Sequence, residues 1–417
     1  MTAINLKNII EIAQRKIAVV DSNSSTRDLE NLMEITMLTG GGHKADSGGF
    51  DSDVSNYVGR VVFIDSGSEG FFKFNQTIAG APSATPNQNF TQIVKSGTYT
   101  TNPSAGSSYT GRQGSNYGYT AAGRNPGAPG PTGAMYTIDK FSFSSDGDAT
   151  DVGDAVTLTF TATGHSSATD GYAAGGGQPS YSDMIQKYPF ASDGNATDIG
   201  YDLFKARRYS TSGAHSETHG YISGGATATG PLGTEHVGTN DLEKFAFTND
   251  ANGTDVGDMT VSKTYRAGQN STTDGYASGG VDAPGTNFVN VIDKYPFASD
   301  GNAADVGDIT GGPSGRYGGS GTSSTTHGYT AGGIAPPYTN IIDKFPFAAD
   351  GNATDVGDLV NTKRFGAGQT STTHAYMSGG GSPYVDVIQK WSTSSDENAS
   401  DIGNLTVSRD LGAPAYY

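Results

Sequence analysis

The stretch "IDKYPFASDGNAADVGDI" (residues 292–309) returns fifty residues later as "IDKFPFAADGNATDVGDL" (residues 342–359). Only four of the eighteen positions differ between the two copies. Near-verbatim repetition at a fixed spacing is typical of a chain that stacks copies of one structural unit. The sequence therefore predicts a repeat protein, and the fold depends on the length and content of one repeat.

Two phrases alternate along the chain, one like "IDKF" and one like "GYTAGG", and each occurs six times. The Lys of the first phrase recurs at spacings of 47, 57, 50, 50 and 46 residues. A period near 50 is too long for a pair of helices and fits four short strands. One unit is predicted to hold strand a ("AGQTST", residues 367–372), strand b (the "GY" phrase), strand c (the "IDKF" phrase) and, after a turn, strand d ("DVGD").

A Gly-Gly doublet that closes the second strand, followed by an apolar strand and a basic segment, resembles the kelch type of β-propeller blade. The chain departs from that pattern at the Trp of the unit, which is present once, as Trp391, and at another position. The resemblance covers residues 105–417. It implies an all-β, six-bladed kelch-like β-propeller over residues 101–417. The ring is expected to close by packing between the last and first blades, with the break near residues 409–413. The amino-acid sequence of the repeated phrase also resembles repeats in virion proteins of marine bacteriophages.

Composition excludes several classes of function. The chain has 25 Lys and Arg against 42 Asp and Glu, a net charge of −17, whereas phosphate binding needs clustered basic residues, so no nucleic-acid partner is expected. There is no Cys, so disulfides, thiolate metal sites and thiol nucleophiles cannot form. Lys7, Glu11 and Arg15 interrupt the N-terminal apolar residues, and no apolar run approaches the roughly 20 residues of a membrane span. Neither a signal peptide nor membrane insertion is expected.

Residues 1–100 carry neither phrase and are expected to form a small N-terminal α+β docking module. Apolar residues recur at helical spacing over residues 6–17 and 26–38, and a β-hairpin is expected over residues 59–75. Two apolar helix stripes with little core of their own to cover are expected to bind another chain. The predicted partner-binding residues are Leu6, Ile9, Ile10, Ala13, Ile17, Leu29, Leu32 and Met33.

The Asp-rich turn between strands c and d allows two interpretations. In one, the side-chain oxygens bind calcium, and the ligands would be Asp300, Asn302, Asp305 and Asp308. Against it, the last of these positions is Tyr201 or Asn404 in two of the six copies. In the other, Asp and Asn accept backbone N–H groups, and Gly supplies the backbone freedom of a turn and bulge. The structural turn is favoured, and no metal ion is expected.

All six units keep the strand-c Lys and the middle Asp of the turn. An unpaired ammonium between blades would be costly, so each Lys is predicted to pair with a middle Asp in a structural role. The six Lys are Lys140, Lys187, Lys244, Lys294, Lys344 and Lys390, and the six Asp are Asp151, Asp198, Asp255, Asp305, Asp355 and Asp401.

The histidines suggest turn and channel positions. Three of them precede the "GY" phrase where other units carry Asp170 and Asp274, which is typical of hairpin-turn chemistry; they are His219, His327 and His374. A polar lining of the central channel, with a weak case for ligand binding, is expected from strand-a residues His165, His215, Gln269, Thr322 and Gln369.

No enzymatic activity and no cofactor are expected. Six equivalent Lys offer no distinctive catalytic residue, and the Cys-linked tyrosine of galactose oxidase, a kelch relative, needs a Cys that this chain lacks. The resemblance implies a bacteriophage virion structural protein, as a tail fibre, baseplate part or capsid-surface appendage. Its expected partners are other virion proteins, further copies of itself and a host-surface glycan. The alternative is a bacterial scaffold or carbohydrate-binding propeller; the phage-like wording and the docking module favour the virion.

Overall fold

The computed structural model describes residues 113–417, apart from 129–132, 178–179, 210–212, 228–236, 249–250, 283–286, 312–314, 337 and 382. Before residue 113 it describes only four strands, β1 (Lys44–Ala45), β2 (Val61–Ile64), β3 (Gly70–Phe74) and β4 (Phe90–Gln92). The chain divides into two compact units, Met1–Ser108 and Tyr109–Tyr417. The described residues contain no α-helix, and thus none that could cross a membrane.

The first unit holds one small sheet with the strand order β1-β2-β3-β4. β2 and β3 pair antiparallel, with Val62 opposite Phe72, which confirms the hairpin predicted over residues 59–75. The two predicted helices and all eight predicted partner-binding residues lie outside the described residues.

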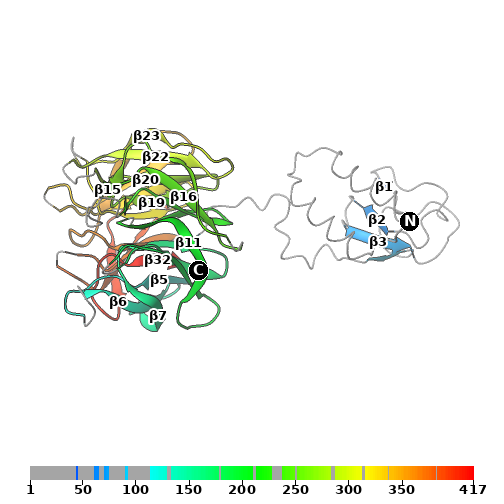
Figure 1. The fold of residues 1–417 in the computed structure, drawn as a ribbon, viewed down its shortest axis with the longest axis horizontal. Coiled ribbons are helices and arrows are strands. Elements are labelled where there is room, and N and C mark those ends of the chain that lie inside the picture. Colours follow the sequence, from blue (N-terminus) through cyan, green and yellow to red (C-terminus); the bar gives the residue numbers. More distant parts are fainter. Residues whose placement is uncertain are drawn as a thin grey trace. The chain divides into compact units, whose positions relative to one another are not determined.

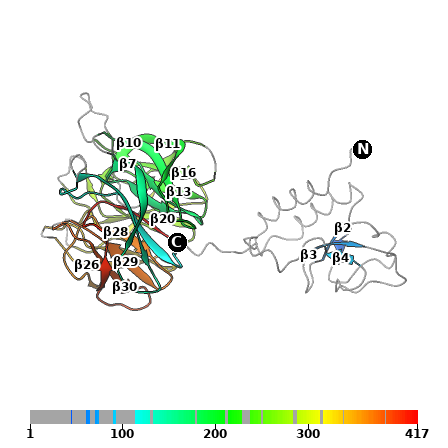
Figure 2. The same cartoon turned by 90° about the horizontal axis from the view of Figure 1, so that it is seen from below.

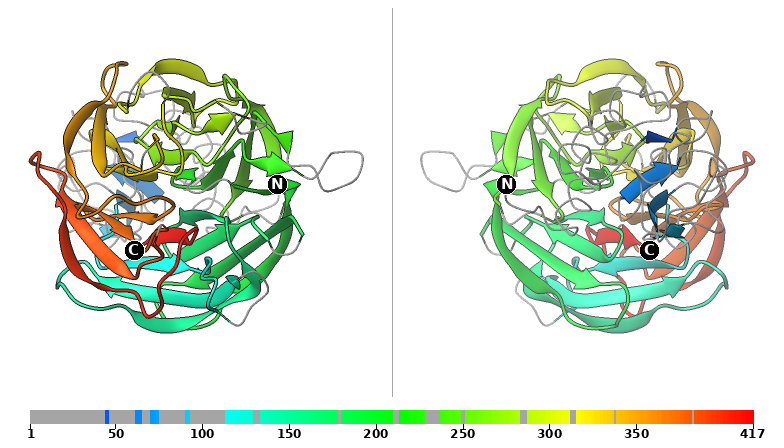
Figure 3. Two further views of the ribbon diagram at one scale, coloured as in Figure 1. Left: turned by 90° about the vertical axis from the view of Figure 1, so that its left-hand side faces the viewer. Right: turned by 90° about the vertical axis from the view of Figure 1, so that its right-hand side faces the viewer.

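The second unit consists of six four-stranded antiparallel blades around one axis (Figure 3). Figure 1 labels the strands of the fourth blade side by side, and Figure 2 does so for three strands of the sixth. In the order a to d, the first three blades are β32 (Ala413–Tyr416), β5 (Tyr117–Ala121), β6 (Met135–Ser142) and β7 (Thr150–Thr159); β8 (Thr163–Ser166), β9 (Asp170–Ala174), β10 (Ser182–Pro189) and β11 (Thr197–Arg208); and β12 (Ala214–His215), β13 (His219–Ser223), β16 (Asp241–Ala246) and β17 (Thr254–Asp258).

The other three blades are β19 (Ala267–Asn270), β20 (Asp274–Ser278), β22 (Val291–Pro296) and β23 (Ala304–Asp308); β24 (Ser320–Ser323), β25 (His327–Ala331), β26 (Ile341–Pro346) and β27 (Thr354–Asp358); and β28 (Ala367–Thr370), β29 (His374–Ser378), β30 (Val387–Ser392) and β31 (Ser400–Asn404). Short strands β14 (Ala226–Thr227) and β15 (Val237–Gly238) extend the second sheet, and β18 (Lys263–Thr264) pairs with β21 (Val281–Asp282). The all-β six-bladed propeller is confirmed, with the "GY" phrase on strand b and the "IDKF" phrase on strand c of every blade.

The predicted closure of the ring was wrong. The first blade takes its strand a from the C-terminal end of the second unit, because β32 pairs with β5 and places Ala413 opposite Ala121 and Tyr416 opposite Gly118. Blades one and six are therefore joined by backbone hydrogen bonds as well as by packing. Without β32, the edge of β5 would leave a row of backbone donors and acceptors unpaired in the middle of the ring.

Neighbouring blades share apolar clusters. Between blades five and six, Tyr329 and Ile342 pack with Met377 and Trp391, and all four side chains are almost fully buried. The Tyr329 hydroxyl donates to the backbone oxygen of Thr393 in the next blade, at 3.2 Å. Both surfaces of a blade are covered in this way, which explains why strand c lacks a clean alternation of apolar and polar residues.

A second kind of contact between blades is ionic and buried. The residue between Ile or Leu and Lys in each "IDKF" phrase is at most 2% exposed. In four blades it is an acid, and it takes a cation from the segment that leads out of the preceding blade. These pairs are Arg409–Asp139 (2.7 Å), Arg207–Glu243 (2.6 Å), Lys263–Asp293 (3.6 Å) and Arg316–Asp343 (2.6 Å). We call them the buried ion pairs.

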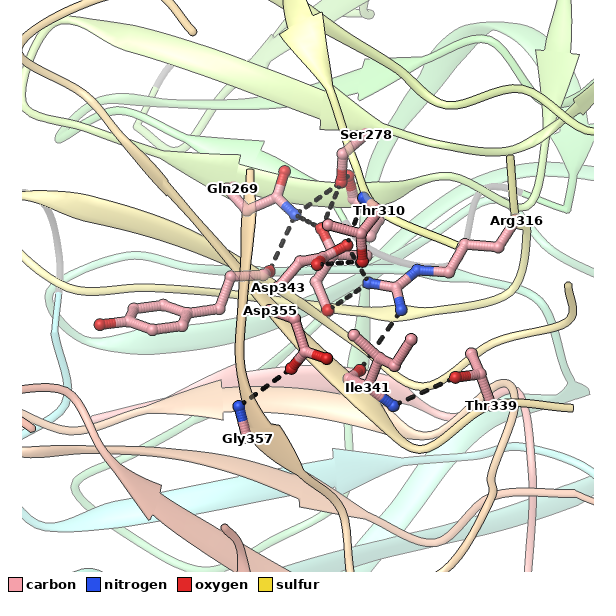
Figure 4. Close-up of polar contacts among 12 residues, drawn as sticks. Gln269, Ser278, Thr310, Arg316, Thr339, Ile341, Asp343, Asp355 and Gly357 are labelled. Atoms are coloured by element: carbon pink, nitrogen blue, oxygen red, sulfur yellow. Dashed lines mark hydrogen bonds and ion pairs between the residues drawn. The ribbon is translucent and has the colours of Figure 1, made fainter. Parts of the chain in front are cut away.

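Figure 4 shows the buried ion pair at Asp343, where Arg316 and Thr310 converge on one carboxylate. The Thr310 hydroxyl donates to Asp343 at 2.6 Å and its backbone N–H donates at 2.9 Å. Desolvation raises the pKa of Asp343 and lowers the pKa of Arg316, because burial disfavours both charged forms. The hydrogen bonds offset part of that desolvation.

Two blades replace the acid with a neutral amide. Gln186 and Gln389 accept the backbone N–H groups of Val156 and Val360, at 2.7 and 2.9 Å. In the three boundaries where strand c carries Asp, a Thr stands in place of Val and donates its hydroxyl to that Asp. These residues are Thr260, Thr310 and Thr406. Thr therefore accompanies Asp and Val accompanies Gln.

A third contact explains the repeated turn. The "DGN" Asn of one blade accepts the backbone N–H of a strand-d residue in the preceding blade, as Asn302 does from Asp258 at 3.0 Å. Equivalent bonds occur at all six boundaries, with Asp148 replacing Asn at the last. The turn also lies directly on strand d of the preceding blade. A Cβ added at Gly307 would be 2.3 Å from the backbone oxygen of Gly351.

We expect Asp343→Ala to lower the free energy of unfolding by about 3–5 kcal/mol, because it leaves Arg316 buried without a counter-charge. The double substitution Arg316→Met, Asp343→Leu should recover most of that loss, since an apolar pair removes both charges together. Urea denaturation measures both. Gln389→Ala is the matched control at a neutral boundary, and an equal or larger loss there would contradict a special role for the buried charge.

Candidate functional site

The antiparallel strands give the propeller two different faces. The a–b and c–d connections lie at one end of every blade, which we call the turn face. The b–c and d–a connections lie at the other end, which we call the loop face. The predicted structural Lys and Asp residues belong to the turn face.

The strand-c Lys pairs with the first Asp of the turn in the next blade, so the predicted pairing with the middle Asp was wrong. The pairs are Lys140–Asp193 (2.5 Å), Lys244–Asp300 (2.5 Å), Lys294–Asp350 (3.1 Å), Lys390–Asp146 (2.5 Å) and Lys344–Asp396. The counterpart of Lys187, at position 250, lies outside the described residues.

The register of the sheet explains the different partner. Lys140 stands opposite Thr150, whereas Asp151 stands opposite Asp139. Neighbouring residues in a strand project from opposite sides, so Lys140 and Asp151 point away from each other. The Asp of each Lys–Asp pair is more than half exposed, and such pairs contribute only about 0–1 kcal/mol each.

The middle Asp of all six turns accepts the backbone N–H of the Gly two residues on. These bonds are Gly153 to Asp151 (3.1 Å), Gly200 to Asp198 (2.8 Å), and Gly257 to Asp255, Gly307 to Asp305, Gly357 to Asp355 and Gly403 to Asp401 (3.2 Å each). Figure 4 includes the bond between Asp355 and Gly357. The structural role predicted for these Asp residues as turn residues is confirmed.

Three of the four residues of the calcium hypothesis use their side-chain oxygens in separate contacts. Asp300 pairs with Lys244, Asn302 accepts from Asp258, and Asp305 accepts from its own Gly307. The last position of the second blade also needs correction. Asp202, and not Tyr201, stands there, because its N–H donates to Asn252 as that of Asp258 does to Asn302. Tyr201 is an extra residue in β11.

The three His before the "GY" phrase confirm the hairpin-turn interpretation. His219, His327 and His374 each have Nδ1 at 2.8 Å from the hydroxyl of the preceding Thr. Asp170 and Asp274 accept from the same Thr position at 2.6 Å. His and Asp interchange here because either side chain can hydrogen-bond the Thr hydroxyl at the same point.

The predicted channel lining is only partly correct. The axis is narrow, and the space open to the centre of a water molecule is about 10 Å³, which is room for about one water. His215 and Thr322 line it. The side-chain amides of Gln269 and Gln369 instead donate to the backbone oxygens of Tyr329 and Tyr119 in the next blade, both at 2.9 Å.

His165 also points between blades. Its Nδ1 is 3.1 Å from the Ala214 oxygen, and its ring is edge-on to Phe245. Glycine near the start of strand a explains the narrow axis. A Cβ at Gly321 would be 2.2 Å from the Gly268 oxygen. This Gly lies in strand a, or directly before it, in five blades, and β32 carries Pro414 instead.

The loop face closes the axis with a ring of left-handed residues. One residue per d–a segment has a φ between 56° and 69°: Thr161, Tyr209, Tyr265, Gly318, Phe365 and Leu411. Backbone N–H groups donate around this ring, from Thr161 to Leu411, Leu411 to Phe365, Phe365 to Gly318, Gly318 to Tyr265 and Tyr265 to Tyr209, at 2.6–3.1 Å. A left-handed non-Gly residue costs about 1–2 kcal/mol, so the ring persists because these bonds and the packing over-determine it.

Aromatic and arginine side chains gather around this ring. Arg124 lies over Phe160 and Tyr384, Arg208 over Tyr181 and Tyr209, and Arg364 over Tyr338 and Phe365, at 4.4–5.6 Å from the ring centroids. The rings also contact one another, with Tyr265 at 4.8 Å from Tyr209 and 4.9 Å from Phe365. We call this group the arginine–aromatic cluster.

The electrostatics of the cluster are uneven. Asp410 is 1% exposed and accepts two hydrogen bonds from Arg124, at 2.9 and 3.1 Å. Desolvation raises the pKa of Asp410, while Arg124 and Arg364 oppose that rise. Arg364 makes no ion pair with a described residue, and its buried Nε has no hydrogen-bond partner there. The buried carboxylate thus pairs with Arg124 and leaves Arg364 without a counter-ion among the described residues.

The cluster was not predicted from the sequence, although a signal was present. Basic–aromatic pairs occur before strand a at residues 208–209, 316–317 and 364–365. The position before the left-handed residue is different in almost every blade: Phe160, Arg208, Thr264, Tyr317, Arg364 and Asp410. The turn face repeats its residues and the loop face does not. A singular site is therefore expected on the loop face.

Comparisons with known proteins give a fold likeness only. No family model matches the chain, and no curated protein matches it. Among solved structures, one titled "Structure of YjhT" is similar at 13% identity and a TM-score of 0.49, and the match covers 63% of this chain and 89% of that one.

Calcium should raise the melting temperature of the full chain by no more than about 5 °C, the size of a non-specific ion effect. Differential scanning calorimetry in calcium, in magnesium and in chelator measures this. A larger rise that is specific to calcium and is lost in Asp305→Asn would establish the metal site against this expectation.

His165 should make the fold sensitive to acid. Burial lowers the pKa of His165 to about 3, against about 6.5 in the unfolded chain. The unfolded chain binds the proton first, so stability falls as pH drops from about 6.5 towards 3, by up to about 1.4 kcal/mol per pH unit. His165→Gln should flatten the pH dependence of the unfolding free energy in that window. The control is His327→Gln, at a half-buried turn position. An unchanged slope in His165→Gln would contradict the assignment.

Proposed function

We propose that the chain is a kelch-type propeller that serves as a non-enzymatic structural protein of a bacteriophage virion, as a tail fibre, baseplate part or capsid-surface appendage. The first unit docks onto other virion proteins or onto further copies of the chain. The propeller presents its loop face to a partner. The alternative is a bacterial scaffold or carbohydrate-binding propeller.

One observation supports the proposal above the others: the repeated residues of this chain stabilise the ring. The turn Asn, the middle Asp and the strand-c Lys make the same contacts around the ring, so the repeated residues hold the blades together. Residues that differ between blades lie on the loop face. This division fits a rigid scaffold that carries one contact surface.

The virion context rests on the resemblance of the repeat phrase and on the predicted docking residues. A mass-spectrometric inventory of purified particles and their subassemblies tests it. Presence of the chain in the particle at a defined copy number supports the proposal. Absence from particles, with genes for a polysaccharide pathway beside its own, favours the alternative.

Deletion of residues 1–40 should leave a folded propeller that no longer joins its assembly, because the deletion removes the predicted docking residues and none of the described blade contacts. Circular dichroism and calorimetry measure folding, and the particle inventory measures incorporation, with the full chain as the control. Normal incorporation of the truncated chain, or unfolding of the ring, would show that the proposed division of labour is wrong.

A further inference from the structure

The arginine–aromatic cluster differs in charge from the rest of the chain. The chain has a net charge of −17. On the turn face, each strand-c Lys whose partner is described pairs with an Asp. On the loop face, Arg124 and Arg364 lie near a single buried carboxylate, and Arg364 stacks on rings without an ion pair among the described residues. A local excess of positive charge on an acidic protein favours an anionic ligand.

Arg364 lies beside two aromatic rings and makes no ion pair with a described residue, so its guanidinium can bind an anionic ligand. A guanidinium that lies over a ring keeps its N–H donors in the plane of the group, at the edge, where they can hold a carboxylate or sulfate by two parallel hydrogen bonds. Tyr384 is half-buried and Tyr338 is exposed, so each presents ring surface beside an Arg. Such rings bind the apolar face of a polar ligand and hydrogen-bond its hydroxyls.

The burial pattern favours a sugar chain over a protein partner. The apolar members of the cluster, Phe160, Phe365 and Leu411, are buried beneath the tyrosines and arginines. A stable protein interface needs a desolvated apolar centre within roughly 800 Å² on each side. The exposed apolar side chains of the described loop face, among them Val156, Phe204, Val261 and Val360, come from different blades. The rings and charged groups around the ring of left-handed residues suit a ligand rich in hydroxyls and anions.

We propose that the loop face binds an anionic polysaccharide, with Arg364 holding its carboxylate or sulfate groups and Tyr338 and Tyr384 contacting its sugar rings. The inference deepens the proposed contact function and rests on it for the biological role of the ligand. Arg124 is assigned to positioning, because its guanidinium is committed to Asp410.

Isothermal titration of the full chain with defined oligosaccharides tests the inference. Alginate oligomers carry carboxylates, carrageenan oligomers carry sulfates, and laminarin oligomers are neutral. We expect binding to at least one anionic probe that weakens as salt rises, and roughly tenfold or more weaker binding to laminarin, the scale of one charge-assisted contact. Which anionic probe binds more tightly identifies the anion.

Variants locate the site. Arg364→Gln should weaken binding roughly tenfold, since it removes a charged hydrogen-bond donor. Arg364→Lys should bind the oligosaccharide more tightly than Arg364→Gln and less tightly than the unchanged chain. Lys keeps the charge but cannot donate two parallel hydrogen bonds to one anion. Lys344→Gln makes the same charge change on the turn face and should have no effect. Equal binding to laminarin, tighter binding to a polyglutamate peptide, or an equal loss in Lys344→Gln would overturn the inference.

The experiment also separates this inference from the proposed function. Arg364→Gln should incorporate into particles normally, whereas the chain without residues 1–40 should still bind the oligosaccharide. Absence of oligosaccharide binding together with loss of incorporation on truncation refutes only the ligand. Oligosaccharide binding together with normal incorporation of the truncated chain refutes only the docking role.

Discussion

The structure depends on charge buried at the boundaries between blades. Four of the six boundaries place an acid and a cation together in the interior, where each ion alone would be strongly destabilising. Each acid comes from one blade and its cation from the blade before it, so the pair forms only when both blades are in register. Buried polar pairs of this kind add little net stability and penalise wrong pairings. Their value here is that the strands of one blade fit the next blade in a single way.

The contacts of the turn explain why its amino-acid sequence is so similar from unit to unit. Every turn must fit the preceding blade, with its Asn and its backbone on strand d and its first Asp on the strand-c Lys. It must also support the bulge of its own blade through the middle Asp. A change in one copy disturbs two blades. The b–c loops differ in length from unit to unit.

The period and the two phrases were enough to predict six blades and the identity of strands b and c, because those features repeat within each unit. The partners of the repeated charges could not be predicted in the same way. Lys140 meets Asp193 of the next unit, and a spacing within one copy contains no information about contacts between copies. The closing strand was missed for a similar reason: β32 belongs to the first blade although it follows the last, and its "APAY" shares only small residues with the other a strands. The covariation of Thr with Asp and of Val with Gln was present in the sequence, but it has a physical meaning only once the two positions are known to touch.

Repetition also determines where a specific site can form. On the turn face, each charged group is one of a set, so a ligand would meet nearly the same surface in every blade and would gain little by choosing one. On the loop face, the ring of left-handed residues fixes the backbone of all six d–a segments and leaves the side chain before each of them free to differ. The rigid ring thus presents five residue types at six equivalent positions, including both a buried acid and two arginines. A surface of this kind acquires asymmetry without loss of the contacts that hold the blades together, and this is the physical reason to place recognition on the loop face.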